Sequence, residues 1–264
     1  MGKSSSFRLS KWYLDCIAED GDGIIVYIAD LHWTVWQIRY ASTLRFSGNK
    51  VETASSVRKC SLPEHANGRI ALELPHLGVE GVWTGSAPSI ERTIFENSDG
   101  AIQWNCLQPA AQVTLRLNRS TDITGTGYAE LLEMSIPPWK LPLEELHWGR
   151  FITDRDRLVW IDWRGPYSRR VLVHNGNDVE AGAITEGTVG SLDSNLHLAL
   201  DRRLVLRSGP LGDTIFSGIS NLARALPAAV LGIRETKWRS HGTLNCAGRA
   251  VEGWAIHEVV GWKK

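Results

Sequence analysis

The feature that most constrains the fold is a succession of short apolar runs, rich in β-branched and aromatic residues. Gly, Pro, Asn and Asp separate these runs along most of the 264-residue chain. Turn signals at about 8- to 12-residue spacing are typical of an antiparallel barrel or sandwich. Outside the 125–165 stretch, we expect strands at residues 11–18, 24–30, 34–46, 69–74, 79–83, 92–95, 102–106, 112–117, 170–174, 181–188, 196–200, 204–207, 234–241 and 251–260.

Two segments depart from this pattern. Residues 214–226 carry apolar side chains at helical spacing, and Pro227 then ends the pattern, so we expect one short helix there. Pro137 and Pro138 cannot supply the N–H groups that a central strand needs, which makes them a natural corner. We therefore expect two barrel-like or sandwich-like β domains, residues 1–137 and 138–264.

Ionisable side chains lie within three apolar and aromatic runs of residues 125–165. Strand alternation places Tyr128 and Glu130 on one face of the first run and Glu133 on the other. One of the two glutamates must therefore face inward if the strand belongs to a closed sheet. In the third run, Trp160 and Asp162 share a face.

The second of these runs contains His147 and Trp148, which alternation places on opposite faces. Either a second carboxylate or His147 could orient a water molecule or remove a proton. The alternative is structural, because each carboxylate could instead form a surface ion pair with Arg150 or Arg164 and contribute little.

The chain contains 12 Trp residues, against five Phe and five Tyr, so an aromatic-lined cavity is one reading and ordinary core packing is the other. A carboxyl in such surroundings has a raised pKa and can act as a Brønsted acid. Aromatic faces can also stabilise a developing carbocation. This combination points to proton-initiated chemistry on an alkene, such as hydration, isomerisation or cyclisation.

Composition and motifs exclude several other classes. Lys plus Arg and Asp plus Glu number 29 each, so no basic excess indicates nucleic-acid binding. The four Cys show no metal-ligand spacing, and we expect neither a metal nor a cofactor, because no nucleotide-binding, nucleophile-elbow or zinc-protease motif occurs. No apolar run is long enough for a membrane span. We expect a cytoplasmic protein; Gly2 and Ser6 formally fit a myristoylation pattern, which leaves peripheral membrane association open.

Several short motifs together resemble a known family. They are Trp-Tyr-Leu-Asp at 12–15, Gly-Thr-Gly-Tyr-Ala-Glu at 125–130, Trp-Gly-Arg-Phe at 148–151, Trp-Ile-Asp-Trp at 160–163 and Glu-Gly-Trp-Ala-Ile-His-Glu at 252–258. Their order resembles that of the carotenoid 1,2-hydratase (hydroxyneurosporene synthase) and AttH-like family. The resemblance implies two lipocalin-like β domains and cofactor-free acid–base chemistry on prenyl, polyene or polyketide-like substrates.

One segment departs from the pattern of the carotenoid hydratases, which carry His-Asp-His-Asn-Trp where this chain has residues 129–133. Glu130 keeps the acidic position, whereas Leu131 replaces a His and Glu133 replaces the Trp. We therefore expect an unsaturated substrate other than a carotenoid.

The sequence leads to one preferred function and two alternatives. The preferred one is a cofactor-independent hydratase- or cyclase-type enzyme in which Asp162 is the leading acid, assisted by Glu130, Glu133 and His147. We expect the substrate to contact Trp160, Tyr128, Trp148, Asp15, Trp12 and His257. The alternatives are a non-catalytic carrier of a hydrophobic small molecule and a shape-driven pericyclase of the Diels–Alder type. The sequence does not specify the oligomeric state.

Overall fold

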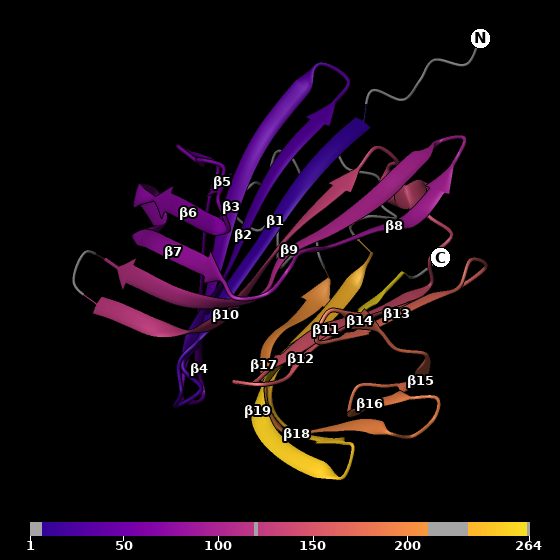
Figure 1. Cartoon of the computed structure of the whole chain (residues 1–264). Helices are drawn as coiled ribbons and strands as arrows, with labels where there is room; N and C mark the ends of the chain where they lie inside the picture. The colour runs from indigo at the N-terminus through magenta and orange to yellow at the C-terminus, as the bar shows by residue number, and fades with distance from the viewer. Residues whose placement is uncertain (1–6, 119–120, 211–231, 263–264) are drawn as a thin grey trace. The chain divides into compact units, whose positions relative to one another are not determined.

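The computed structural model describes residues 7–118, 121–210 and 232–262, which form an all-β structure (Figure 1). Within these three segments the only helical turns are the 3₁₀ turns η1 (Pro75–Leu77) and η2 (Pro138–Lys140), and no helix could span a membrane. The helix predicted at 214–226 lies outside the described residues. The chain divides into two compact units, Met1–Leu141 and Pro142–Lys264. The domain boundary at 137/138 stays a prediction.

The first unit contains one antiparallel sheet in which the first strand pairs with the last. The strand order is β4-β3-β2-β1-β10-β9-β7-β6-β5, with β8 added along β9. Its strands are β1 (Phe7–Ile17), β2 (Gly23–Trp33), β3 (Trp36–Ser47), β4 (Lys50–Ser56), β5 (Glu64–Ala66), β6 (Arg69–Leu74), β7 (Val79–Gly85), β8 (Ile90–Asn97), β9 (Gly100–Leu117) and β10 (Thr121–Met134).

The second unit repeats this topology with its own first and last strands at the centre. Its order is β14-β13-β12-β11-β19-β18-β17-β16-β15, the same path as in the first unit apart from β8. Its strands are β11 (Glu145–Ile152), β12 (Arg157–Arg164), β13 (Arg169–His174), β14 (Asn177–Asp178), β15 (Ala181–Ile184), β16 (Thr188–Ser191), β17 (Leu196–Pro210), β18 (Arg234–Cys246) and β19 (Arg249–Gly261). The prediction of two antiparallel β units is therefore confirmed.

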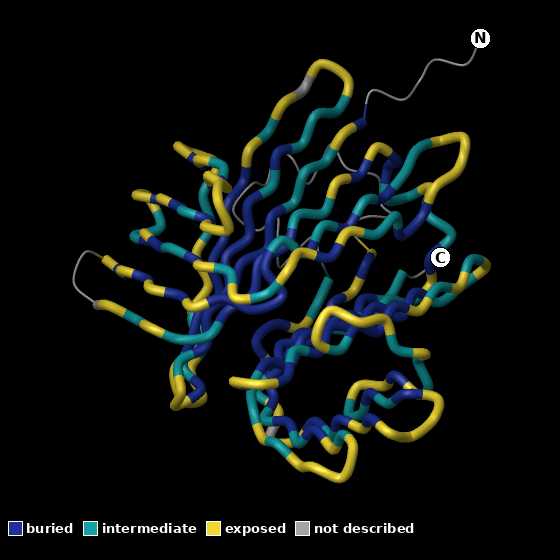
Figure 2. The backbone as a smooth tube through the Cα atoms, viewed as in Figure 1, coloured by how far each residue is buried: buried dark blue, intermediate teal, exposed yellow. Residues whose placement is uncertain are grey.

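Each sheet buries one face as an apolar core, and Figure 2 shows the buried positions concentrated in the central strands. In the first unit, Trp12, Leu14 and Cys16 of β1 lie in the core together with Trp83 of β7. The core of the second unit contains Phe151 and Trp160, among other apolar residues. In β1 the core thus takes every second residue, as a strand with one apolar face requires.

Some strand limits differ from those predicted, because local turn signals misplace the ends of long strands. The separate strands expected at 102–106 and 112–117 form one strand, β9, in which Pro109 falls where the β9–β10 register shifts. A bulge tolerates proline because no ladder N–H is required there. Likewise, the strands at 196–200 and 204–207 merge into β17, which has register shifts of its own. The strand expected at 181–188 is instead the two short strands β15 and β16.

Candidate functional site

Two tyrosines and two acidic residues lie on the paired strands β1 and β10 of the first unit, so that each tyrosine faces an acidic residue of the other strand. Tyr13 lies directly opposite Glu130, and Asp15 lies directly opposite Tyr128. All four side chains point to the face opposite the apolar core, because they alternate with Leu14 and Ala129, which belong to it. All four are buried; Glu130, at 9% exposure, is the most accessible.

Hydrogen bonds within each strand link each phenol to a carboxyl group. The Tyr13 hydroxyl donates to Asp15 Oδ2 at 2.9 Å, and the Tyr128 hydroxyl donates to Glu130 Oε2 at 2.6 Å. Both pairs have the form Tyr-x-acid, whose members share one face of a strand. Trp104 of β9 adds a third bond, donated by Nε1 to Glu130 Oε2 at 2.6 Å. We call Tyr13, Asp15, Tyr128, Glu130 and Trp104 the tyrosine–carboxyl cluster.

The phenol of Tyr128 stays protonated in these surroundings. Burial, followed by the effects of the neighbouring Cys106 and Glu130, raises the pKa of Tyr128 well above its usual value. The Tyr128 hydroxyl is therefore a hydrogen-bond donor across the physiological pH range, and it is directed at a carboxyl oxygen.

Aromatic rings surround the same face. Tyr13 makes edge contacts with Tyr27 and Tyr128, at ring-centroid distances of 5.4 and 5.9 Å. The Lys11 ammonium lies 5.2 Å from the centroid of the Tyr27 ring, so the ring already interacts with a cation.

Two further predicted residues of the first unit lie apart from the tyrosine–carboxyl cluster. Trp12 is in the apolar core on the other face of β1. Glu133 is exposed on β10, where Asn105 Nδ2 lies 3.5 Å from its Oε2. Of the two glutamates considered from the sequence, Glu130 is therefore the buried one.

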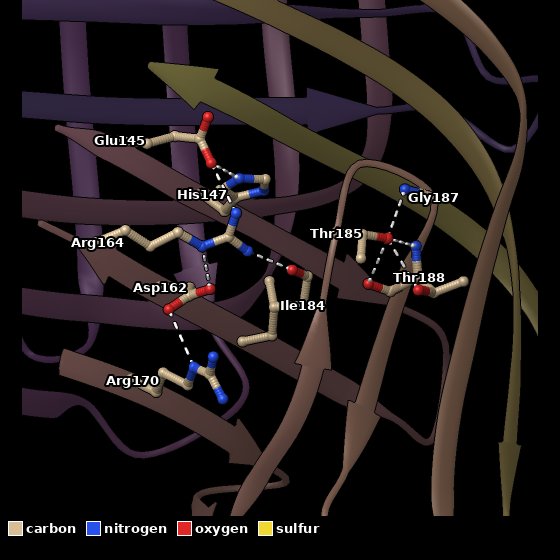
Figure 3. Close-up of polar contacts among 9 residues, drawn as sticks. All are labelled: Glu145, His147, Asp162, Arg164, Arg170, Ile184, Thr185, Gly187 and Thr188. Carbon is tan, nitrogen blue, oxygen red and sulfur yellow. Dashed lines mark hydrogen bonds and ion pairs between the residues drawn. The ribbon is translucent and has the colours of Figure 1, made fainter. Parts of the chain in front are cut away.

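In the second unit, Asp162 is fully buried and bound by two arginines (Figure 3). Arg164 Nε donates to Asp162 Oδ2 at 2.8 Å, and Arg170 Nε donates to Oδ1 at 3.2 Å. We call these three residues the Asp162 network. Hydrogen bonds between oppositely charged groups are stronger than those between neutral groups. The pairing with Arg164 is the structural alternative considered from the sequence.

The two arginines of the Asp162 network also reach an edge strand of the same sheet. Arg164 Nη2 donates to the carbonyl of Ile184 at 2.5 Å, and Arg170 Nη1 donates to that of Gly182 at 3.3 Å. Ile184 and Gly182 belong to β15, which is at one end of the sheet, whereas β12 and β13 lie near the other. The guanidinium groups thus donate hydrogen bonds to β15 backbone carbonyls, in place of the backbone N–H groups that a neighbouring strand would provide.

The turn that follows β15 is held by one side chain. Thr185 Oγ1 accepts hydrogen bonds from the backbone N–H groups of Gly187 and Thr188, at 3.2 and 3.1 Å (Figure 3). This turn connects β15 to β16. It therefore helps to hold in place β15, the strand whose carbonyls accept hydrogen bonds from Arg164 and Arg170.

His147 contacts the Asp162 network through Glu145. His147 Nε2 lies 2.7 Å from Glu145 Oε1, which also accepts a bond from Arg164 Nη1 at 2.6 Å (Figure 3). Burial raises the pKa of Glu145, but hydrogen bonds and charges from His147 and Arg164 outweigh it and leave that pKa below its usual value. His147 also lies directly opposite Asp162 in the β11–β12 register.

His257 and Trp160 lie next to each other on either side of Gly149. Gly149 pairs with Trp160 on β12 and with His257 on β19. Ser240 Oγ lies 2.7 Å from His257 Nε2, and the Trp238 ring stacks on the imidazole at 5.1 Å. Burial first, and then the positive charges of Arg203 and Lys237, lower the pKa of His257 to about 3.

Replacing Gly149 with alanine is expected to lower the free energy of unfolding by about 2 kcal/mol, because overpacking a tight core forces neighbours to move. A Cβ atom at Gly149 would lie 2.2 Å from Trp160 Cζ2 and 2.7 Å from His257 Cβ. Urea unfolding measures the change. Gly261→Ala is the control, since nothing lies within 4 Å of its Cβ position. Equal stability of the two variants would contradict the prediction.

Trp148 projects to the other face of the second sheet. Its ring centroid lies 5.3 Å from Lys237 Nζ, and Lys237 is fully buried and bonded to Glu258. A short chain of alternating charges continues through Glu235 to Arg207, which donates to both carboxylate oxygens at 2.7 Å. Such a paired, buried network is typical of a structural element.

The predicted site residues thus fall into two groups, one in each unit. The first unit brings together Asp15, Tyr128 and Glu130, and the second places His147, Asp162, Trp160 and His257 on one sheet face. Sequence reasoning missed Tyr13, Trp104, Cys106 and Arg170. The repeated Tyr-x-acid pattern at 13–15 and 128–130 is a signal that could have indicated Tyr13.

Comparison with known proteins identifies the fold. No protein-family model matches the sequence, and no curated protein sequence matches it. Among solved structures, an AttH-like protein from Nitrosomonas europaea matches with a TM-score of 0.59 at 13% identity, covering 98% of this chain and 94% of that one. CghA matches with a TM-score of 0.55 at 11% identity, covering 98% and 89%. Kievitone hydratase from Nectria haematococca matches with a TM-score of 0.52 at 12% identity, covering 97% and 89%. The predicted AttH-like fold is confirmed.

Proposed function

We propose that this protein is a cofactor-independent enzyme that protonates a hydrophobic unsaturated substrate, with Glu130 as the proton donor. The observation that carries the proposal is the convergence of two donors, Tyr128 and Trp104, on one oxygen of a buried carboxyl group. The products would be those of alkene hydration or cyclisation, and the substrate a prenyl, polyene or polyketide-like compound.

The bonding pattern of Glu130 suits a proton donor. Because Oε2 accepts from the Tyr128 hydroxyl and the Trp104 N–H, a proton on this carboxyl group would reside on Oε1. After the proton leaves, the same two donors stabilise the carboxylate that forms. The donors are already in place, so this stabilisation requires no rearrangement.

The chemical step balances without a redox partner. The π electrons of the alkene take the proton from Oε1, and the more substituted carbon becomes a carbocation. An aromatic face can stabilise such a charge. Water then adds and returns a proton to Glu130, which gives net hydration. If a second double bond attacks instead, a ring forms, and loss of a proton to Glu130 restores the enzyme.

The Asp162 network suits this role less well. Its two carboxylate oxygens are each held by a guanidinium group, so the geometry supports an anchor for Arg164 and Arg170. The role of Asp162 as acid stays a prediction, and we assign the donor to Glu130 instead.

The structural relatives support the substrate class. Kievitone hydratase, whose name describes hydration of kievitone, shares this fold along nearly its whole length. One fold can carry many different functions, so the fold alone does not support this substrate class. The support comes from the shared fold together with the buried carboxyl group of Glu130.

The experiment is a screen of prenylated phenols and linear polyenes in D₂O, with products analysed by mass spectrometry. We expect deuterium incorporation, and we expect Glu130→Gln to slow it at least about 100-fold, the lower range for general acid catalysis. Asp122→Asn, an exposed change on the same strand, is the control. If well-folded Glu130→Gln keeps its rate, the assignment fails. A pericyclase would show no deuterium uptake, and a carrier would bind compounds without converting them.

A further inference from the structure

We infer that the end of the β2–β3 hairpin binds the surface of an anionic lipid bilayer, with Val35 inserted among the lipid headgroups. Val35 belongs to the two-residue turn that joins β2 to β3, and Figure 2 shows this turn exposed. Its side chain is 91% exposed, against 61% for Leu192 and 48% for Val205. A single exposed apolar residue is ordinary on a protein surface, so the inference depends on the residues around it.

The sequence of this turn is not the one that hairpin geometry favours. Thr34 has a φ of 56°, a conformation in which a β-branched residue is strained and in which Gly, Asn or Asp is usual. The Thr34 hydroxyl donates to the carbonyl of Trp33 at 2.7 Å. The chain thus places a strained residue and an exposed apolar residue at the same turn. Such an outlier points to a function of the turn.

One face of the hairpin end is apolar and only partly covered. Leu9, Leu31 and Ile38 pair with one another across β1, β2 and β3, and all three are half-buried. Trp33 lies two residues along β2 from Leu31, so it projects from the same face. Its ring centroid lies 5.2 Å from that of Trp139. Tryptophan with one apolar side and one wet side is typical of a membrane–water interface.

The opposite face of the hairpin end exposes basic groups. Arg8 is exposed and pairs with His32, whose side chain is 45% exposed. Arg39 is 46% exposed. The one acidic residue between positions 30 and 39 is Asp30, whose side chain is only 10% exposed and lies 3.3 Å from His32 Nε2 and 3.1 Å from Arg39 Nε. The exposed charges of this segment are therefore basic, which complements a negatively charged surface.

An anionic bilayer matches both faces of the hairpin end. Partly buried apolar and aromatic side chains beside exposed basic groups are typical of elements that lie in the lipid headgroup region. A second copy of this hairpin would instead bring like charges together, which disfavours association. The inference is independent of the proposed function, since binding to lipid requires no turnover and makes no use of Glu130.

Co-sedimentation with lipid vesicles tests the inference. We expect the protein to bind vesicles of mixed phosphatidylglycerol and phosphatidylcholine more tightly than vesicles of phosphatidylcholine alone, and less tightly as salt is added. Val35→Ser should weaken binding about 10-fold, the effect expected from removing one buried valine side chain. The matched control is Val57→Ser, which changes a valine that is 45% exposed and lies outside the hairpin. It should bind as the wild-type protein does.

A charge variant provides the second readout. We expect Arg8→Gln to weaken binding to the phosphatidylglycerol vesicles about 5-fold, the effect of one basic residue at an anionic surface. Urea unfolding checks that each variant is folded. Failure of the wild-type protein to bind either kind of vesicle would overturn the inference, as would equal binding by Val35→Ser and Val57→Ser. A dimer that dissociates in Val35→Ser, without vesicle binding, would assign the hairpin end to a second copy and also overturn it.

Discussion

Replacing Asp162 with asparagine is expected to lower the free energy of unfolding by about 3 kcal/mol, because removing one partner of a buried ion pair leaves charges uncompensated. Asp162 is fully buried and anchors Arg164 and Arg170, which in turn donate to β15 carbonyls. The Arg side chains are 37% and 50% exposed, so water offsets part of the loss and places the effect at the lower end of the usual range.

Urea unfolding measures the loss, and amide hydrogen exchange at residues 181–184 tests its origin. We expect faster exchange along β15 in Asp162→Asn, since the arginines that hold this strand lose their anchor. The matched control is Glu186→Gln, which removes a carboxylate from an exposed pair with Arg203. It should change stability by less than about 1 kcal/mol. A similar small change in Asp162→Asn would contradict the structural role.

Acidification is expected to destabilise the protein through His257. The folded-state pKa is about 3 against an ordinary value of 6.5, so below pH 6.5 the unfolded chain binds a proton that the folded protein does not. Stability from this group is therefore lost as the pH falls from 6.5 towards 3. The loss is about 2 kcal/mol at pH 5 and about 4 kcal/mol at pH 3.

The measurement compares wild type with His257→Gln by urea unfolding at several pH values. We expect the difference in unfolding free energy between the two proteins to be constant from pH 7 to 8 and to shift in favour of the variant by about 2 kcal/mol between pH 6.5 and 5. Glutamine can keep a hydrogen bond to Ser240 without gaining a charge. Parallel curves for the two proteins down to pH 5 would show that His257 is not held neutral by burial.

Strand alternation could be predicted from the sequence because it depends only on neighbouring residues. It placed Tyr128 with Glu130, and Trp160 with Asp162, on common faces, as the structure shows. Alternation alone could not decide whether Glu130 or Glu133 is buried. That depends on where the strand ends: Glu133 lies next to Met134, the last residue of β10, and is exposed.

Contacts between strands distant in sequence could not be predicted in this way. The pairing of β1 with β10 joins Asp15 to Tyr128, and no local pattern specifies that register. The same applies to Arg170, whose contact with Gly182 arises where β15 comes within reach of β13. The contact of Asp162 with Arg170, and through it with β15, therefore became visible only with the three-dimensional structure, and with it the reason to assign the acid to Glu130.

The measurement that tests the central claim most directly is the single-turnover rate of deuterium transfer in Glu130→Gln and Asp162→Asn, at a temperature where both remain folded. We predict a loss of at least about 100-fold for Glu130→Gln and of less than about 10-fold for Asp162→Asn. The reverse order, with transfer abolished in a folded Asp162→Asn and retained in Glu130→Gln, would contradict the assignment of the proton donor to the tyrosine–carboxyl cluster.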